Sequence, residues 1–373
     1  MNNNTKNKVI FAGGGTGGHI YPGLALAQYL EGTQANQESI FIGGNQGLEK
    51  SILSTTKYLL KTTLVKPFNQ AGALKKILSL FWFLPIATIQ AIILLIKIKP
   101  KWVLSLGSYA AVPVGIAAFL LRIPLFTWEP NAKAGLANRL LSYFSRINFI
   151  IFKEVKNQLK GQCLISGLPL RKELIKKIPL SGPVPFTNTT AFSSKQPFKI
   201  LIVGGSLGSN FLNTNFCKLW PYLKQHPISI IHQTGKKHFE TTKQAYKIYN
   251  QNALKYKVVK YLPNIYEEYG WANLVISRAG INTLFELAAC AKASVLIPYS
   301  LSADNHQYKN AKVLEKNKQA ILVEEKAFST IKLKSIIENF IQYPETLAHL
   351  EKNITSFYSK NAEGFIIDKI TKT

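Results

Sequence analysis

Two stretches of this chain share a pattern: an apolar run of strand length ends in a cluster of glycines, and a helical stretch follows. The first stretch is KVIFAGGGTGGH at residues 8–19, and the second is FKILIVGGSLGS at residues 198–209. Glycines lack a Cβ atom, so they permit positive φ and a close approach of the backbone to a ligand or a neighbouring strand. A strand that leads through such a turn into a helix begins a βαβ unit, which predicts parallel sheets.

Each glycine turn is followed by further apolar runs that are long enough to form buried strands. Most of these runs end in glycine or in a polar turn, and helical stretches separate them. The two sets of runs lie at residues 8–13, 39–44, 102–107 and 123–128, and at residues 198–205, 228–235, 257–262, 273–280 and 293–299. The alternation predicts an α/β fold of two doubly wound domains, each with a parallel sheet.

The two sets of strands are separated by a segment with the composition of a linker. Residues 167–197 contain five prolines, two glycines and a run of Ser, Thr and Asn. We therefore predict an N-terminal domain at residues 1–166, a linker at 167–197 and a C-terminal domain at 198–350. The last segment, residues 351–373, is predicted to be helical and is a candidate to pack back on the N-terminal domain.

The chain is strongly basic, with 46 Lys and Arg residues against 19 Asp and Glu residues, for a formal charge of +27. Such an excess favours anionic partners: nucleic acid, acidic lipid head groups or phosphorylated substrates. A compositional drift towards lysine explains many of these charges equally well. The three cysteines have neither paired nor metal-like spacing, which fits buried thiols in a reducing compartment. The first residues lack the apolar segment of a signal peptide.

The first glycine turn suggests a dinucleotide site, but its second requirement is missing. Gly13, Gly15 and Gly18 match G-x-G-x-x-G, which is a weak pattern by itself. A dinucleotide site also needs an acid at the end of the second strand to hold a ribose, whereas that strand ends in Gly43–Gly44–Asn45. The next helix is expected to start near Pro22, and its N-terminal amides would favour an anion.

After the two glycine turns, a third candidate site is the stretch SRAGINTLFE at residues 277–286, which follows a predicted strand of the second domain. Asn282 or Thr283 is expected to cap the next helix, which would place Glu286 in its first turn. An acid there either complements the helix dipole or holds two vicinal hydroxyls, as a ribose requires.

Other polar residues follow strands of the second domain. Ser206, in the second glycine turn, offers a hydroxyl to a phosphate beside bare backbone amides. His306 and Gln307 are placed to hydrogen-bond a sugar, although isolated polar residues are more often solvated. Two glycine turns that open two successive domains predict a ligand-binding cleft, because ligands of such sheets bind beyond the carboxyl ends of the strands.

The ordered set of motifs resembles one known family over almost the whole chain. The motifs are GGGTGGH near the start, GSYAAVP at 107–113, WEPN at 128–131, GLPLR at 167–171, GGSLGS at 204–209, HQTG at 232–235, SRAGINTLFE at 277–286 and DNHQ at 304–307. Each motif alone is weak, but their order and spacing resemble those of the MurG family of bacterial N-acetylglucosaminyltransferases, in glycosyltransferase family 28.

The resemblance implies a GT-B fold, in which two Rossmann-like doubly wound parallel-sheet domains face each other across a cleft. It implies inverting transfer of N-acetylglucosamine from UDP-N-acetylglucosamine to the 4-hydroxyl of undecaprenyl-diphosphate-linked N-acetylmuramoyl-pentapeptide, which converts lipid I to lipid II in peptidoglycan synthesis. No metal and no other cofactor is expected. The expected partners are the lipid I acceptor, anionic inner-leaflet lipids and, as candidates, other proteins of cell-wall synthesis, but not nucleic acid. The expected location is the cytoplasmic face of the bacterial inner membrane, with peripheral attachment.

The resemblance also assigns substrate-binding positions. Glu286 matches the acid that holds the ribose, Leu262 matches a backbone contact to uracil, and Gln307 beside His306 matches the contact to sugar hydroxyls. The full expected set is Thr16, Gly17, Gly18, Asn131, Arg171, Ser206, Leu262, Ile281, Asn282, Thr283, Leu284, Phe285, Glu286, His306 and Gln307.

The acceptor hydroxyl needs a base, and two residues are candidates. His19 is preferred because an imidazole titrates near neutral pH, and Glu129 is the second choice. Binding of the acceptor diphosphate is an equally good role for His19. Tyr109 matches an acceptor-side position that orients the substrate. Backbone amides and an arginine would stabilise the charge that builds on the departing UDP.

Three motifs depart from the family pattern. WEPN stands where the family has H-E-Q-N, so Pro130 removes a backbone donor near the sugar pocket. Leu168 and Leu170 interrupt the family's N-P-V-R, and Ser108 replaces a glycine of the acceptor loop. These changes affect details of the pocket more than the class of reaction.

Residues 77–96 carry no charge, and a span of about 20 apolar residues can cross a bilayer. Pro85 is expected to divide the segment and to begin a helix of about fourteen residues. Because a sheet strand follows at 102–107, we interpret this helix as a crossover helix. The resemblance to the MurG family implies that the region docks on the surface of the inner leaflet, where an apolar wedge beside lysines suits anionic lipid. The expected membrane-contacting residues are Leu74, Lys75, Lys76, Ile77, Leu78, Phe81, Trp82 and Phe83.

Three competing interpretations exist. A related GT-B enzyme with another lipid acceptor would keep the motifs of the second domain and change those of the first. A basic nucleic-acid-binding protein fits the charge, but no helix-turn-helix, zinc or RNP-like pattern is present. An integral membrane protein would need more than one apolar segment of this kind to form a polytopic transporter.

Overall fold

The computed structural model describes residues 6–373 except 15–16, 34–35, 45–48, 66–72, 171–191, 193–195, 206 and 251–254. Side chains at residues 73–82 and 250 are also outside this description. The chain divides into two compact units, one of residues 1–172 with 359–373 and the other of residues 173–358. We call these units the N-terminal and C-terminal domains.

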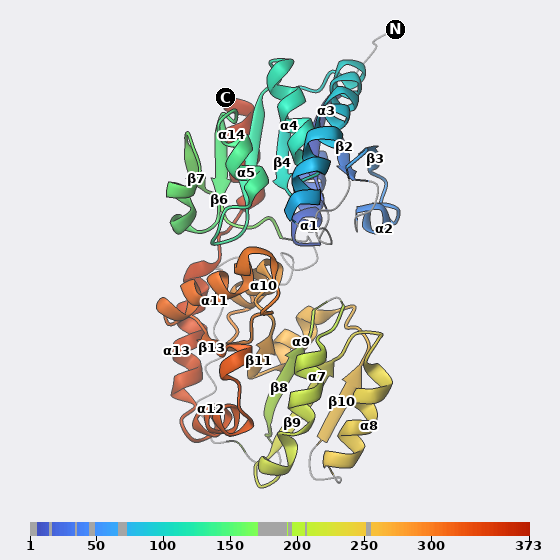
Figure 1. The fold of residues 1–373 in the computed structure, drawn as a ribbon. Coiled ribbons are helices and arrows are strands. Elements are labelled where there is room, and N and C mark those ends of the chain that lie inside the picture. The colour runs from blue at the N-terminus through green and yellow to red at the C-terminus, as the bar shows by residue number, and fades with distance from the viewer. Residues whose placement is uncertain are drawn as a thin grey trace. The chain divides into compact units, whose positions relative to one another are not determined.

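The N-terminal domain contains a seven-stranded parallel sheet in the order β3-β2-β1-β4-β5-β6-β7 (Figure 1). Its strands are β1 (Asn7–Gly13), β2 (Gln37–Gly44), β3 (Leu59–Thr63), β4 (Val103–Gly107), β5 (Leu125–Glu129), β6 (Ile147–Ile150) and β7 (Cys163–Ile165). The chain order reverses on either side of β1, so β1 and β4 are the neighbours whose carboxyl ends mark the topological switch point.

Helices cover both faces of this sheet. They are α1 (Gly17–Thr33), α2 (Glu49–Leu53), α3 (Ala73–Ile98), α4 (Ala111–Leu120), α5 (Leu136–Leu141), the 3-10 helix η1 (Lys153–Gln158) and α14 (Ala362–Lys372). One face packs its strand side chains against α3, α4 and α5 in a single apolar core. Helices α1 and α14 contact each other, and the bare backbone of Gly23 in α1 lies against Phe41 and Leu106 of the sheet.

The C-terminal domain contains a six-stranded parallel sheet in the order β10-β9-β8-β11-β12-β13 (Figure 1). Its strands are β8 (Phe198–Val203), β9 (Ile228–Gln233), β10 (Lys255–Val259), β11 (Leu274–Ser277), β12 (Ser294–Leu296) and β13 (Ile321–Leu322). Its α-helices are α7 (Asn210–Cys217), α8 (Phe239–Asn250), α9 (Ile265–Trp271), α10 (Ile281–Ala289), α11 (His306–Lys316), α12 (Thr330–Gln342) and α13 (Glu345–Ile354). Short 3-10 helices, η2 to η5, lie at Trp220–Tyr222, Ala303–Asn305, Glu325–Ala327 and Thr355–Phe357.

The prediction of two doubly wound parallel-sheet domains is confirmed, but four strands were missed. Three of them, β3, β7 and β13, lie at sheet edges. Edge strands are short and only partly buried, so their apolar signal is weak. The fourth, β6, is a buried strand of four residues. The run predicted at 257–262 is displaced, because β10 ends at Val259.

Two helix boundaries differ from expectation because prolines lie inside the helices. Helix α1 begins at Gly17 rather than near Pro22, so His19 is in its first turn. Pro22 is tolerated because the carbonyl that it leaves unbonded belongs to that first turn. Helix α3 runs unbroken through Pro85, so the expectation of a separate short helix is wrong. Pro85 is exposed, which lets water hydrate the carbonyl one turn earlier.

Candidate active site

His19 lies where the first glycine turn meets the end of β4. The half-buried imidazole packs against the backbone of Gly107, where a Cβ atom would lie 3.2 Å from its Cδ2 and 3.3 Å from its Nε2. Gly107 has φ +93°, and Ser108 follows at φ +69°. A glycine at 107 therefore meets two requirements at once: left-handed backbone and room for the histidine ring. Gly17 and Gly18 begin α1, whereas Thr16 lies outside the described residues.

Glu129 ends β5 and is buried, with both carboxylate oxygens hydrogen-bonded. Its Oε1 accepts from the backbone N–H of Asn131 (3.1 Å) and from Asn131 Nδ2 (3.4 Å). Its Oε2 accepts from the Gly135 N–H and from Asn138 Nδ2, both at 3.0 Å. Burial raises the pKa of Glu129, and these hydrogen bonds oppose the rise. The carboxylate thus organises the loop that leads into α5, and the side chain of Asn131 points back towards it.

Tyr109 lies in the turn between β4 and α4 and is half-buried. Burial raises the pKa of its phenol, and the negative charge of Glu49 adds to the rise. Glu49 itself is buried at the start of α2, and its Oε1 accepts from the Gly44 N–H at 2.9 Å. A Cβ atom at Gly14 would fall within 3.0 Å of the Glu49 carboxylate. No sequence motif indicated this acid, which packs on Gly14 just after β1 and on the two glycines that end β2.

In the C-terminal domain, α10 presents the predicted ribose-binding acid. Its N-cap is Gly280, without a side-chain cap, so the expectation that Asn282 or Thr283 caps the helix is wrong. The helix begins two residues earlier than a cap at Asn282 would allow, and Glu286 therefore lies beyond the first turn. Glu286 is half-buried, and its Oε2 accepts a hydrogen bond from Tyr269 Oη at 3.1 Å.

The other predicted residues of α10 differ in what they can offer a ligand. The side chains of Ile281, Leu284 and Phe285 are buried in the core, and Phe285 packs on Phe357 with ring centroids 4.5 Å apart. Any ligand contact from these three residues is therefore through the backbone. Asn282 and Thr283 are half-buried on the second and third positions of the helix.

Arg278, between β11 and α10, was also missed. Its Nη1 donates to the carbonyls of Ile297 (3.0 Å) and Pro298 (3.3 Å) and pairs with Glu325 Oε1 at 2.6 Å. Glu325 Oε2 in turn accepts from the Ser300 N–H at 3.2 Å. This nearly buried pair ties the ends of neighbouring strands together, which holds the start of α10 in place. The partners are remote in sequence, so no local motif indicates them.

His306 and Gln307 begin α11, after two residues with left-handed backbone, Asp304 (φ +51°) and Asn305 (φ +56°). His306 Nδ1–H donates to the Ala303 carbonyl at 2.7 Å, so the neutral ring offers Nε2 as an acceptor. Burial lowers the pKa of His306, which favours this neutral form. Gln307 Oε1 accepts from the Tyr299 N–H at 3.0 Å, which fixes this side chain against the segment that follows β12.

The second glycine turn is fastened to the end of β9. Gln233 Oε1 accepts from the Gly204 N–H at 3.1 Å, and Gln233 Nε2 donates to the Gly205 carbonyl at 3.0 Å. Gly208 has φ +77°, and a Cβ atom there would collide with the Thr234 carbonyl. The turn is therefore rigid at both ends. Ser206 and Arg171 lie outside the described residues, and Leu262 is buried just after β10.

His232 of the HQTG motif has a structural role. It is fully buried, with Nε2 3.0 Å from Asn213 Oδ1 and Nδ1 2.9 Å from Tyr246 Oη. An amide oxygen only accepts, so Nε2 carries the proton and Nδ1 accepts from the tyrosine. Burial lowers the pKa of His232 to about 3, which keeps the ring neutral.

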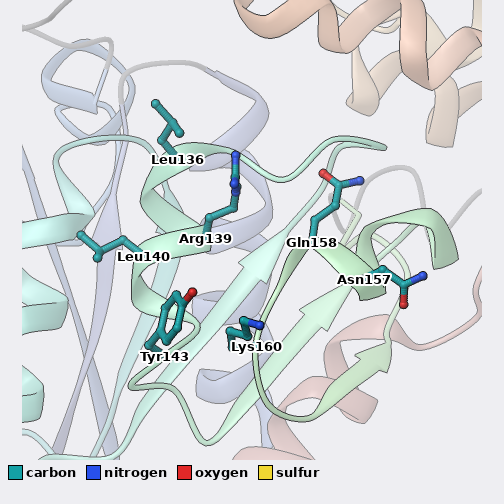
Figure 2. A pocket seen from close by; sticks show the side chains of 7 residues that line it. All are labelled: Leu136, Arg139, Leu140, Tyr143, Asn157, Gln158 and Lys160. Atoms are coloured by element: carbon teal, nitrogen blue, oxygen red, sulfur yellow. The ribbon is translucent and has the colours of Figure 1, made fainter.

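A surface hollow of about 590 Å³ lies beside α5 (Figure 2). Its lining combines apolar side chains with cations and amides: Leu136, Arg139, Leu140, Tyr143, Asn157, Gln158 and Lys160. Gln158 Oε1 also accepts from the Ala134 N–H at 3.0 Å, so this wall supports the loop that Glu129 organises. None of these residues was predicted as part of the site. Within the described ranges, no group of three or more His, Cys, Asp or Glu residues is placed to hold a metal ion.

In the predicted membrane segment, the structure describes side chains only in the C-terminal portion of α3, from residue 83 onwards. The side chains of Leu74, Lys75, Lys76, Ile77, Leu78, Phe81 and Trp82 lie outside the described residues, and Phe83 is half-buried. Ala87, Ala91 and Leu95 are buried, and the latter two belong to the core beneath the sheet. Among described residues, no helix is long and apolar enough to span a membrane.

Two family models match this chain. The glycosyltransferase family 28 N-terminal domain matches residues 9–149, and the glycosyltransferase family 28 C-terminal domain matches residues 199–364. A relative from Geotalea uraniireducens (strain Rf4) is 31% identical, over 98% of each chain. Another from Myxococcus xanthus (strain DK1622) is 32% identical, over 92% of this chain and 87% of its own. Both are named UDP-N-acetylglucosamine–N-acetylmuramyl-(pentapeptide) pyrophosphoryl-undecaprenol N-acetylglucosamine transferase.

Solved structures show the same two-domain fold. The crystal structure of Acinetobacter baumannii MurG has a TM-score of 0.79 and 27% identity, with 98% of this chain and 100% of that chain covered. A UDP-GlcNAc 2-epimerase from Neisseria meningitidis, 14% identical, has a TM-score of 0.67 over 98% of this chain and 100% of that chain, which shows the fold alone. The predicted GT-B class is confirmed. With near-full-length identity above 30% and both family 28 domains in order, this chain belongs to the MurG family of glycosyltransferase family 28.

Proposed function

We propose that this protein transfers N-acetylglucosamine from UDP-N-acetylglucosamine to lipid-linked N-acetylmuramoyl-pentapeptide and so converts lipid I to lipid II. The observation that carries the proposal is 31% identity over 98% of both chains with an enzyme whose name states this donor and acceptor. In the proposed division of labour, the C-terminal domain binds the donor and the N-terminal domain binds the acceptor.

In this mechanism, His19 removes the proton from the 4-hydroxyl of the acceptor as its oxygen attacks C1 of N-acetylglucosamine. The new glycosidic bond forms on the face opposite the departing diphosphate, so the configuration inverts and UDP leaves with the electron pair. The half-buried imidazole at the end of β4 supports this role, since a base must combine access with fixed orientation. Glu286, oriented by Tyr269, is proposed to hold the ribose of UDP.

The reaction is tested with purified protein, labelled UDP-N-acetylglucosamine and lipid I in detergent. The expected result is a labelled lipid product with the mobility of lipid II, and release of one UDP for each transfer. Other undecaprenyl-linked sugars serve as competing acceptors. Transfer to one of these but not to lipid I, from protein with an intact thermal transition, would replace the proposed acceptor.

We also propose peripheral attachment to anionic membranes through the exposed face of α3. Ile86, Ile89, Ile93 and Ile96 are 45–58% exposed and recur every three or four residues, so they form one stripe opposite the buried face. Exposed lysines at 97, 99 and 101 follow at the C-terminal end of the stripe. An apolar stripe beside positive charge suits an interfacial helix on anionic lipid.

Salt should not release the wild-type protein from phosphatidylglycerol-containing vesicles, because apolar insertion persists when charges are screened. The double variant Ile89→Glu/Ile93→Glu is expected to pellet with vesicles at low salt and to dissociate at high salt. Ile248→Glu, at an exposed isoleucine of α8, is the matched control and should behave as wild type. Clean release of the wild type by salt would contradict the insertion of an apolar face.

A further inference from the structure

A continuous buried hydrogen-bond chain connects Glu129 with the turn that supports His19. Asn138 Nδ2 donates to Glu129 Oε2 at 3.0 Å, and Asn138 Oδ1 accepts from Ser105 Oγ at 3.1 Å. Ser105 Oγ accepts in turn from the Gly107 N–H at 3.2 Å. The side chains of Glu129, Asn138 and Ser105 are at most 2% exposed. The chain therefore runs through the interior from β5, through α5, to the end of β4.

The last link of this chain sets the backbone on which the His19 ring lies. A Cβ atom on Gly107 would lie 3.2 Å from His19 Cδ2 and 3.3 Å from both His19 Nε2 and Asn138 Nδ2, so the ring and the amide side chain both lie on the open side of this glycine. Gly107 and Ser108 both have left-handed backbone, which is costly for the serine. Ser105 Oγ accepts from the N–H of Gly107, the first residue of this strained pair. Ser108 Oγ accepts from the Ala110 N–H at 3.3 Å.

We propose that Glu129, Asn138 and Ser105 are positioning residues for His19, and that Glu129 does not itself take the acceptor proton. This inference rests on the proposed function for the identity of the reaction, but not for the geometry. Glu129 accepts three hydrogen bonds from the loop that it organises and one from Asn138 of α5, so its oxygens already have partners. The same contacts make it the anchor of the chain, because Asn138 Nδ2 reaches both Glu129 and the Trp128 carbonyl (2.9 Å).

Ser105→Ala is the mildest break in the chain, because it leaves Glu129 and His19 unchanged. Misplacing a catalytic group by about 1 Å can lower turnover about 100-fold, so we expect a loss of about 10- to 100-fold in kcat with lipid I. Affinity for UDP should not change. Ser39→Ala on β2 is the matched control, since Ser39 is also buried and its hydroxyl has no hydrogen-bond partner among the described residues.

Glu129→Gln separates positioning from proton transfer. Glutamine has one acceptor oxygen, so its NH₂ would face either the donors of Asn131 or those of Gly135 and Asn138. Under the proposal, Glu129→Gln and Ser105→Ala lower kcat by similar factors, and the double variant loses little more activity than either single variant. The pH profile of Glu129→Gln should still show the fall in kcat at low pH that accompanies protonation of the base. If Glu129 were the base, Glu129→Gln alone would remove that ionisation while Ser105→Ala stayed close to wild type.

An NMR measurement makes failure of the inference distinguishable from failure of the proposed function. In full-length protein with labelled histidine, the His19 ring signal, assigned by its loss in His19→Ala, should shift in Ser105→Ala and not in Ser39→Ala. This readout needs no substrate. A wild-type protein inactive on lipid I would overturn the proposed function alone. An unmoved His19 signal, or kcat of Ser105→Ala equal to that of Ser39→Ala, would overturn the positioning role.

Discussion

Replacing His19 with alanine is expected to lower turnover with saturating UDP-N-acetylglucosamine and lipid I by about 10²- to 10⁴-fold. General-base catalysis contributes a factor of this size because the attacking hydroxyl otherwise keeps its proton as the glycosidic bond forms. The affinity for UDP should stay within about twofold, since Glu286, which is proposed to hold the ribose of UDP, belongs to the other domain. Steady-state kinetics and calorimetry with UDP measure the two effects separately.

The same variant distinguishes the two roles that remain open for His19. If His19 instead binds the acceptor diphosphate, the KM for lipid I rises while kcat is largely retained. His349→Ala, at an exposed position of α13 in the other domain, is the control for loss of an imidazole outside the predicted site. A kcat of His19→Ala within about fivefold of wild type would exclude the role as base.

Replacing Glu286 with alanine is expected to weaken binding of UDP by about 10- to 100-fold, because hydrogen bonds to a charged group contribute about 1.5–3 kcal/mol. The carboxylate is half-buried, and the hydroxyl of Tyr269 holds one of its oxygens at 3.1 Å. Tyr269→Phe should therefore weaken binding by a smaller factor, since it loosens the carboxylate without removing it. Calorimetric titration with UDP measures both.

The ligand can be varied to test whether Glu286 contacts the ribose. Wild-type protein should bind UDP more tightly than 2′,3′-dideoxy-UDP, whereas Glu286→Ala should bind both equally, because the variant lacks the group that distinguishes them. Glu345→Ala, at an exposed acid of α13, should retain the preference. If Glu286→Ala keeps the full preference for UDP, the ribose is held by another residue.

Much of the fold could be predicted from local sequence. The glycine turns after β1 and β8 and the buried strands around them have patterns that depend only on neighbouring residues. The missed strands β3, β7 and β13 are edge strands, whose apolar pattern is too short to identify alone. Helix starts were the other error. Pro22 and Pro85 are strong local signals for a boundary, but both lie within continuous helices.

The candidate site was predictable as a set of positions but not as a set of contacts. The motifs placed His19, Glu129 and Glu286 just after strands of the sheets. In the structure His19 and Glu286 lie in the helices α1 and α10, and Glu129 is the last residue of β5. Nothing in the motifs indicated that Glu49 would pack on Gly14, or that Tyr269 would hold Glu286. These partners come from other elements of the chain, and a single sequence does not show which elements meet.

Glu129 illustrates which features the sequence determines by itself and which depend on the tertiary structure. Sequence alone determined that an acid lies at the end of the β5 segment, that glycines end β1 and β4, and that the chain forms two parallel-sheet domains, because these features follow from backbone conformation and burial of nearby residues. Only the tertiary structure decided that the Glu129 carboxylate faces inward to Asn138 and the loop before α5. A buried carboxylate must be satisfied by donors, and those donors are brought to it by packing rather than by sequence neighbours.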